Sequence, residues 1–262
     1  MRVYPKKRLG QNFLIDLNIA KKIIEALELK KSDIILEIGS GRGELTSLIA
    51  PRVSKVYAVE LDKRLKEAFS LRLKGYNNVS AINQDILKVD FKDIYRGRKK
   101  IKVFGNIPYY ISSPIIEYLI NNRAGITDAF ITVQKEFAKR VVACPGSKDY
   151  GALSLFAQYY TLPKIILNIS RGCFYPAPKV DSALLSLRFK DASLVPAVSR
   201  ELLFRIIRSA FNQRRKTLRN SLKGIVEAKE IEEFLLRRKK SPNARPEELS
   251  LSNFADLASA ST

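Results

Sequence analysis

The chain has 262 residues, enough for one large domain or two unequal ones. It contains no histidine, which excludes histidine general bases, histidine-activated nucleophiles and nearly every zinc site, so no metal is predicted. The 47 lysines and arginines outnumber the 26 aspartates and glutamates, and the net charge of +21 favours a polyanionic partner such as nucleic acid.

No run approaches 18 consecutive apolar residues, and the basic N-terminal stretch lacks the apolar segment of a secretory signal. We therefore expect a cytoplasmic protein without a membrane span. The two cysteines, Cys144 and Cys173, stand in no metal-ligand spacing, and we interpret them as reduced structural thiols. Nothing in the sequence demands more than a monomer.

Strand and helix patterns alternate up to about residue 190. A first helix is expected after Asp16, with Ile19, Ile23, Ile24 and Leu27 on one face. Further helices are expected within 40–50, 62–74 and 114–121, and strands at 33–39, 55–60, 79–85, 101–106, 128–134, 163–169 and 180–189. This alternation predicts an α/β fold with a mostly parallel sheet covered by helices on both faces. The last two strands are expected to pair antiparallel at the sheet edge.

After Lys190 a linker-like passage leads into a region that shows helical patterns only. We therefore predict two domains, residues 1–190 and a helical domain of residues 191–262. The second part carries 14 basic and 9 acidic residues, a net charge of +5, so that +16 of the total of +21 lies in the first part. Both parts contribute to the positive field.

A glycine-rich turn, GSGRG, follows the strand expected at 33–39. Its G-x-G-x-G spacing differs from the G-x-G-x-x-G of dinucleotide folds, so a pyrophosphate site is not favoured. Gly39 and Gly41 still allow a ligand to approach the backbone at the start of a helix. Taken alone, this turn is as compatible with a structural role as with a cofactor site.

Two carboxylates end the next two expected strands. Glu60 stands 21 residues after Gly39, where an acid can accept two ribose hydroxyls, and Asp85 is suited to accept the exocyclic amine of an adenine. Each acid alone could equally cap a helix. Because ligands bind at the carboxyl edge of such sheets, the combined set predicts a site for adenosine without phosphate. S-adenosylmethionine is the candidate cofactor.

The stretch GNIPYY ends the strand expected at 101–106. The exocyclic amine of adenine is a poor nucleophile because its lone pair is delocalised into the ring. The side-chain oxygen of Asn106 and the backbone carbonyl of Ile107, fixed by Pro108, can accept both N–H hydrogens of that amine. Tyr109 offers a face for an extruded base, and such stacking is worth about 1–3 kcal/mol. The structural alternative is a proline turn with Tyr109 in the core.

Several motifs together resemble the KsgA-type ribosomal RNA adenine dimethyltransferases. They are QNFL (11–14), EIGSGRG (37–43), NIPYYISSP (106–114), QKEFA (134–138), FYPAPKVDSA (174–183) and AFNQRRKTLRNSL (210–222), in family order. The resemblance implies a Rossmann-like class I methyltransferase domain, a small helical C-terminal domain and S-adenosylmethionine as cofactor. It also implies dimethylation at N6 of two adjacent adenosines, in the hairpin loop near the 3′ end of small-subunit rRNA, within an assembling subunit.

The same resemblance gives individual residues their expected roles. Cofactor contacts are implied for Asn12, Leu14, Gly39, Glu60, Asp85 and Asn106. The target base would lie between Tyr109 and Phe174, although Phe174 could instead be a core aromatic. Contacts to rRNA phosphates are implied for Arg214, Arg215, Lys216 and Arg219, some of which could instead pack between the domains. Ser40 replaces the proline usual in the family, and we expect no consequence.

Two alternatives remain open at the level of sequence. Antibiotic-resistance methyltransferases acting on large-subunit rRNA share QNFL-like and NIPY-like motifs, so the catalytic centre does not separate the two groups. The forms AFNQRRKTLRNSL and FYPAPKVDSA favour the small-subunit enzymes. A non-catalytic ribosome assembly factor is the second alternative, against which the intact set of expected catalytic residues argues.

Overall fold

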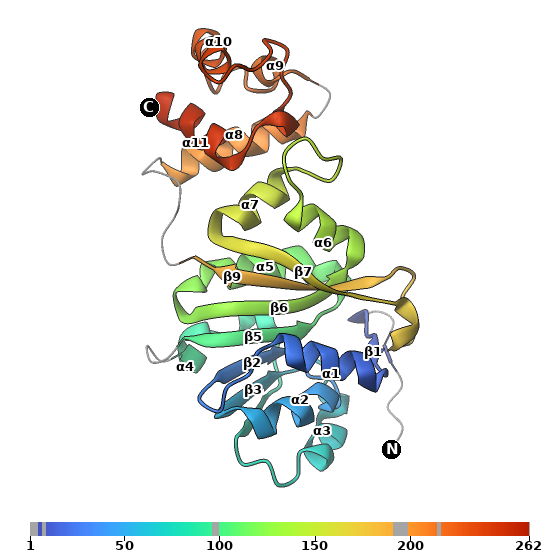
Figure 1. Ribbon diagram of the computed structural model, residues 1–262. Helices are drawn as coiled ribbons and strands as arrows, with labels where there is room; N and C mark the ends of the chain where they lie inside the picture. The colour runs from blue at the N-terminus through green and yellow to red at the C-terminus, as the bar shows by residue number, and fades with distance from the viewer. Residues whose placement is uncertain (1–4, 7–8, 96–99, 191–198, 214–215, 262) are drawn as a thin grey trace. The chain divides into compact units, whose positions relative to one another are not determined.

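The computed structural model describes residues 5–6, 9–95, 100–190, 199–213 and 216–261 (Figure 1). The chain divides into two compact units. Unit 1 consists of residues 1–138 and 164–189, and unit 2 consists of residues 139–163 and 190–262. The predicted boundary near residue 190 falls at one junction between the units. Residues 139–163, which the prediction assigned to the first domain, group with the C-terminal helices instead.

A seven-stranded sheet of order β4-β3-β2-β5-β6-β9-β7 forms the centre of unit 1. Its strands are β2 (Ile34–Ile38), β3 (Lys55–Val59), β4 (Val79–Ile82), β5 (Ile101–Asn106), β6 (Ile126–Gln134), β7 (Thr161–Ile169) and β9 (Ser182–Phe189). The pairs from β4 to β6 are parallel, and β9 runs antiparallel to β6. The expected mostly parallel α/β fold is confirmed. The last two predicted strands are neighbours at the sheet edge as expected: β9 pairs with β7, the edge strand, and on its other side with β6.

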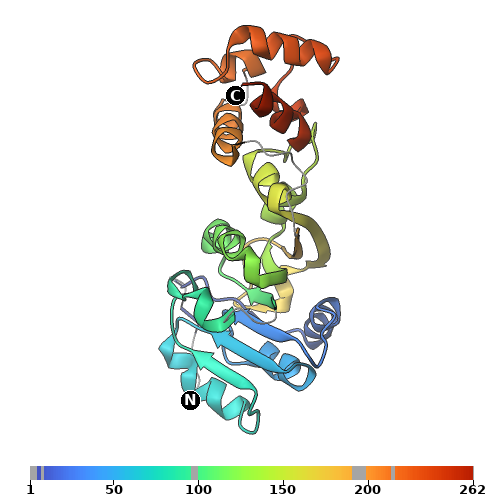
Figure 2. The ribbon, with the colours of Figure 1, turned by 90° about the vertical axis from the view of Figure 1, so that its left-hand side faces the viewer.

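Helices cover both faces of this sheet. They are α1 (Leu17–Ala26), α2 (Glu44–Ile49), α3 (Lys66–Arg72), α4 (Phe91–Tyr95) and α5 (Ser112–Asn121). Asp16 caps α1 as predicted, because its carboxylate accepts the Asn18 and Ile19 amides at 2.8 and 3.0 Å. In Figure 2, α1 lies on one side of the strands while α4 and α5 lie on the other.

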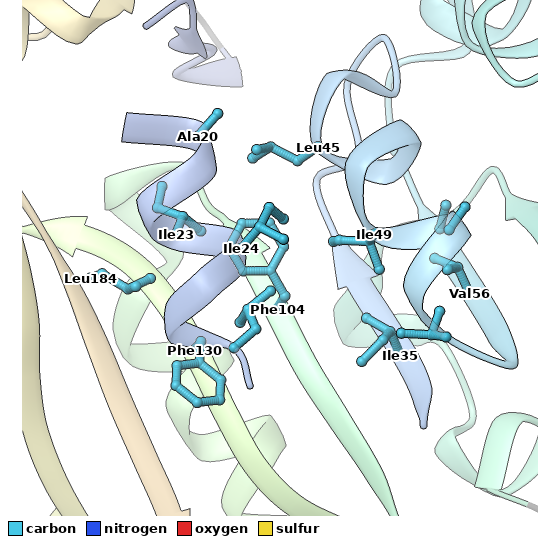
Figure 3. Close-up of a cluster of buried hydrophobic side chains, with 14 of the residues drawn as sticks. Ala20, Ile23, Ile24, Ile35, Leu45, Ile49, Val56, Phe104, Phe130 and Leu184 are labelled. Atoms are coloured by element: carbon cyan, nitrogen blue, oxygen red, sulfur yellow. The ribbon is translucent and has the colours of Figure 1, made fainter. Parts of the chain in front are cut away.

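The core on the α1 side joins the first helix to the sheet (Figure 3). Ile23 and Ile24 of α1 pack with Phe104, Phe130 and Leu184, which come from β5, β6 and β9 in turn. Side chains alternate between the two faces of a strand, so this cluster identifies the residues that face α1. At the carboxyl ends of β5 and β6 the same alternation carries polar side chains, which positions the site described below.

A short two-stranded sheet also belongs to unit 1. β1 (Phe13–Leu14) pairs antiparallel with β8 (Phe174–Tyr175), joining the QNFL motif to the FYPAPKVDSA motif across 160 residues of sequence. Two-residue strands carry no usable periodicity, and the sequence did not predict this pairing. The Tyr175–Pro176 peptide bond is cis.

Unit 2 is helical. Besides the end of α6 (Lys135–Val142), it contains α7 (Ala152–Tyr160), α8 (Arg200–Asn212), α9 (Leu218–Ser221), α10 (Ala228–Arg237) and α11 (Leu251–Ala260). Phe204 of α8 stacks among the aromatic rings of α7, and the Tyr150 hydroxyl donates to the Leu249 carbonyl at 2.9 Å. None of the described helices in either unit is long and apolar enough to cross a membrane.

Candidate functional site

Four neighbouring strands bring the predicted site residues to one edge of the sheet. In sheet order β4-β3-β2-β5, Asp85 follows β4, Glu60 follows β3, Gly39 follows β2, and Asn106 ends β5. The chain order reverses direction between β2 and β5, because β3 and β4 add on one side while β6 adds on the other. Ligands of open α/β sheets bind at such a switch point, beyond the carboxyl ends of the strands.

Gly39 brings the chain close to the end of β5. Its φ of +73° lies in the left-handed region, and a Cβ built there would lie 3.2 Å from the backbone oxygen of Asn106. Both the dihedral and the contact therefore favour glycine. The glycine turn thus joins the two halves of the sheet edge at the switch point.

Glu60 is held by backbone amides on both carboxylate oxygens. Gly41 donates to Oε2 at 2.9 Å, and Asp62 donates to Oε1 at 2.8 Å. Burial raises the pKa of Glu60, and the hydrogen bonds to Asp62 and Gly41 oppose that rise. A carboxylate has about four acceptor positions, so two positions stay available for a ligand.

A cavity that is partly open to solvent lies over this edge. Gly39, Gly41, Glu60, Asp85 and Asn106 all line it, together with the predicted residues Asn12, Ile107, Pro108 and Tyr109. The described lining residues include two carboxylates and neither lysine nor arginine. In a chain with a net charge of +21, this composition disfavours a phosphate-bearing ligand and suits an uncharged or cationic one.

The side chain of Asn106 is held by a hydrogen bond to the N-terminal segment. Its side-chain Nδ2 donates to the backbone oxygen of Asn12 at 3.1 Å. A carbonyl oxygen can only accept, so the amide nitrogen must face Asn12, and Oδ1 is the end left to accept from a ligand. The predicted role of Asn106 as an acceptor is therefore compatible with its orientation.

The aromatic face beside Asn106 is also fixed. The Tyr109 hydroxyl and the Ser182 Oγ at the start of β9 lie 2.6 Å apart, within hydrogen-bond distance. Burial raises the pKa of Tyr109, so the phenol stays neutral at physiological pH. The carbonyl of Pro108 accepts the Ile111 amide at 3.2 Å, closing the turn that carries the ring. The ring of Tyr109 lines the cavity while its hydroxyl is tied to the sheet.

Phe174 occupies a different environment from Tyr109. It is 3% exposed, belongs to the hydrophobic core and is absent from the described residues that line the cavity over the sheet edge. The sequence left two interpretations of Phe174 open, and its position in the structure is that of a core aromatic. Leu14, its partner in the β1–β8 pair, lines a second pocket with Gly39, Gly41 and Asn106.

The predicted RNA-binding residues lie in unit 2. Arg214 and Arg215 fall outside the described residues. Lys216 is exposed, and Arg219 at the start of α9 forms an ion pair of 2.9 Å with Glu232 of α10. Both members of that pair are more than half exposed, so the ion pair is weak and open to competition by a phosphate. Within the described chain, no group of acidic or cysteine side chains is placed to hold a metal ion.

Sequence reasoning missed two residues near the site: Gln11, which lines the cavity, and Glu37, which lines the second pocket with Leu14. Gln11 donates through Nε2 to Asp62 at 3.0 Å. It stands in the QNFL motif next to Asn12, so the motif itself was the available signal. Glu37 on β2 is buried and accepts from the Thr46 hydroxyl at 2.6 Å. Desolvation raises the pKa of Glu37 to about 8, and no strand-end pattern marks it.

The sheet order, the glycine turn and the acidic strand ends define a Rossmann-like methyltransferase. The family model described as "Ribosomal RNA adenine dimethylase" matches residues 4–260. The chain therefore belongs to the ribosomal RNA adenine dimethylase family, and it is a methyltransferase enzyme.

Similar proteins agree with this assignment. A "Ribosomal RNA small subunit methyltransferase A" of Caldanaerobacter subterraneus is 43% identical over 97% of this chain and 96% of its own. A protein of that name from Pelotomaculum thermopropionicum is also 43% identical, over 98% and 91%. Among solved structures, a dimethyladenosine transferase from Plasmodium falciparum matches with a TM-score of 0.78 at 30% identity, over 94% of this chain and 95% of its own.

A large-subunit enzyme also shares this fold. The structure of the 23S rRNA methyltransferase ErmE matches with a TM-score of 0.77 at 26% identity, over 95% of this chain and 99% of its own. The two structural likenesses are nearly equal in TM-score, so the fold alone does not separate small-subunit from large-subunit enzymes.

Proposed function

We propose that this protein transfers methyl groups from S-adenosylmethionine to N6 of two adjacent adenosines, in the 3′-terminal hairpin loop of small-subunit rRNA during subunit assembly. The observation that carries the proposal is the line of Asp85, Glu60, Gly39 and Asn106 along one sheet edge, in a cavity without described basic residues. The small-subunit names of the relatives at 43% identity support the choice of rRNA. We further propose a cytoplasmic monomer.

The residues of the cavity fit S-adenosylmethionine. The remaining acceptor positions of Glu60 suit two ribose hydroxyls, Asp85 suits the adenine amine, and the described lining residues leave the sulfonium facing no like charge. Asn12, Leu14 and Gly41 would complete the contacts. When bound, S-adenosylmethionine supplies a methyl group on a positively charged sulfur.

Binding of the cofactor can be tested without turnover. Glu60→Gln replaces one acceptor oxygen by a donor, and hydrogen bonds to charged groups are worth about 1.5–3 kcal/mol. We expect the Kd for S-adenosylmethionine, measured by calorimetry, to rise at least tenfold. Glu67→Gln makes the same charge change on the exposed surface of α3 and is the control. An unchanged Kd in Glu60→Gln would contradict the ribose contact.

The chemical step needs the target amine to be made nucleophilic. Oδ1 of Asn106 accepts one amine hydrogen and the backbone oxygen of Ile107 accepts the other, which favours a pyramidal nitrogen with its lone pair toward the methyl carbon. The nitrogen–carbon bond would form as the carbon–sulfur bond of the cofactor breaks with its electron pair moving to sulfur, and the cationic nitrogen would then release its proton to water. The reaction requires no histidine base.

Positioning of the base falls to Tyr109. Its hydroxyl is anchored by Ser182, so the ring presents a fixed face to an extruded adenine. Phe174 packs in the hydrophobic core and would act on the base only after leaving that position. Lys216 and Arg219, with Arg214 and Arg215, would contact rRNA phosphates, which gives the C-terminal helices an RNA-binding role.

The deciding experiment measures transfer of labelled methyl groups to purified unmethylated small subunits, to large-subunit rRNA, and to neither, followed by digestion to nucleosides. Dimethyladenosine from small subunits alone is the expected result. Label in large-subunit rRNA would favour the ErmE-like alternative and retain the roles of Asn106 and Tyr109. Binding to subunits without transfer would identify a non-catalytic assembly factor.

A further inference from the structure

Thr132 carries a buried hydroxyl that the fold does not use. The residue lies on β6 and is 1% exposed. Within the described part of the chain, its Oγ1 has no hydrogen-bond partner. An unpaired buried hydroxyl costs free energy, because its hydrogen bonds to water are lost on folding and none replaces them. Such a group in a native protein calls for an explanation by function.

Thr132 stands directly beside Asn106. The two residues are register partners in the parallel pair of β5 and β6, at the carboxyl ends of both strands. Two positions earlier, Phe104 and Phe130 are also partners, and both pack in the core on the α1 face (Figure 3). Because side chains alternate along a strand, Thr132 and Asn106 share that face. Neighbouring strands lie about 4.8 Å apart, which puts the hydroxyl within reach of the amide by side-chain rotation.

The side-chain amide of Asn106 can donate a second hydrogen bond. A side-chain amide carries two N–H groups, and one of them donates to the Asn12 oxygen at 3.1 Å. We propose that Thr132 is a positioning residue whose hydroxyl accepts the second N–H of Asn106 when the target adenine is bound. The amide is then held at its nitrogen from two sides, with Oδ1 directed at the adenine amine. This inference rests on the proposed function of Asn106.

Binding of the adenine explains why the hydrogen bond from Asn106 to Thr132 forms only in the loaded site. When Oδ1 accepts a hydrogen from the amine, the amide becomes more polarised and its free N–H becomes a stronger donor. Thr132 is the side chain next to Asn106 on β6 whose oxygen is buried and uncommitted. The unpaired hydroxyl of the free protein thus gains a donor in the loaded site, where the contact improves the geometry of transfer.

Two variants separate this role from a structural one. Thr132→Val keeps the shape and removes the hydroxyl, so kcat should fall about three- to tenfold while the Kd for S-adenosylmethionine stays within twofold and Tm stays equal or rises. Thr132→Ser keeps the hydroxyl and loses a buried methyl, so kcat should stay within twofold of wild type while Tm falls. A slow, stable valine variant with an active, less stable serine variant is the expected pattern. Thr127→Val, on the same strand, is the matched control for kcat.

A second measurement tests the hydrogen bond between Asn106 and Thr132 without relying on turnover. The side-chain amide resonances of Asn106, assigned by their loss in Asn106→Ala, should shift when S-adenosylhomocysteine and the unmethylated hairpin RNA are added. Part of that shift should be missing in Thr132→Val. Equal shifts in both proteins, no shift in wild type, or wild-type kcat in Thr132→Val would each overturn the inference. Absence of methyl transfer by the wild type would refute the proposed function, and the amide shifts would still decide the contact.

Discussion

The cavity of unit 1 and the helices of unit 2 use charge in opposite ways. The cavity has two carboxylates among its described lining residues, and Glu60 is fixed by two backbone amides. On unit 2, Lys216 is exposed and Arg219 takes part in an exposed ion pair. A fixed, partly buried carboxylate recognises a small ligand by geometry, whereas exposed basic side chains attract a polyanion through their field. On the proposed function, one basic chain would carry two kinds of recognition.

The largest effect is expected when Asn106, the proposed acceptor in the cavity, is removed. Asn106→Ala deletes the proposed acceptor for the adenine amine, and loss of one such fixed contact typically lowers kcat by about 10²–10³. We expect at least a hundredfold fall in kcat, with the Kd for S-adenosylmethionine changed only a few-fold. Single-turnover methyl transfer and calorimetry measure the two quantities. Near-normal turnover would refute the proposed role, and Asn121→Ala, at the end of α5, serves as control.

Replacement of the aromatic face should have the next largest effect. Tyr109→Ala removes a stacking surface worth about 1–3 kcal/mol, so kcat/KM for the RNA substrate should fall about ten- to a hundredfold. Tyr109→Phe keeps the ring and loses only the hydrogen bond to Ser182. That variant should lose no more than a few-fold. If both variants lose activity equally, the hydroxyl rather than the ring face is what matters.

The basic residues of unit 2 are expected to strengthen RNA binding through their positive electrostatic field. Changing Arg214, Arg215 and Lys216 together to alanine should weaken RNA binding about tenfold at low salt, because fewer counterions are released. The slope of log Kd against log salt concentration should flatten. Changing Lys21, Lys22 and Lys30 to alanine removes the same total charge from unit 1. An equal response in both variants would mean that net charge, and not this cluster, determines affinity.

The smallest expected effect concerns Glu37, the buried acid on β2. Desolvation raises the pKa of Glu37 from an ordinary value of 4.5 to about 8. Between these pH values the folded protein binds a proton that the unfolded chain has released, so stability falls as pH rises from about 4.5 to about 8. Glu37→Gln, which has no charge to bury, should lack this contribution.

The measurement for Glu37 is the difference in Tm between variant and wild type at pH 5 and at pH 9. A kilocalorie per mole corresponds to about 2–4 °C for a chain of this size, so the difference should grow by at least about 3 °C in favour of the variant at pH 9. Glu67→Gln, on the surface of α3, should show no such growth. A constant difference would mean that Glu37 titrates like an exposed acid.

Much of the fold could be predicted because local sequence patterns specify its strands and helices. The strand at 101–106 was predicted with its observed bounds, and Asp16 was identified as the cap of α1. Hydrophobic alternation and capping chemistry act over a few residues, so one sequence suffices to see them. Local patterns do not show partners that are distant in sequence. The pairing of β1 with β8 and the grouping of residues 139–163 with the C-terminal helices depend on long-range contacts.

The sequence by itself determined which polar residues end the strands of the sheet, and hence that Gly39, Glu60, Asp85 and Asn106 lie at one sheet edge. Only the tertiary structure decided how these groups are held. It placed the Asn106 amide against Asn12, tied the Tyr109 ring to Ser182, buried Phe174 in the core and left the hydroxyl of Thr132 unpaired within the described chain. The physical reason is that strand ends follow from local periodicity, whereas hydrogen bonds and burial depend on which distant segments pack together.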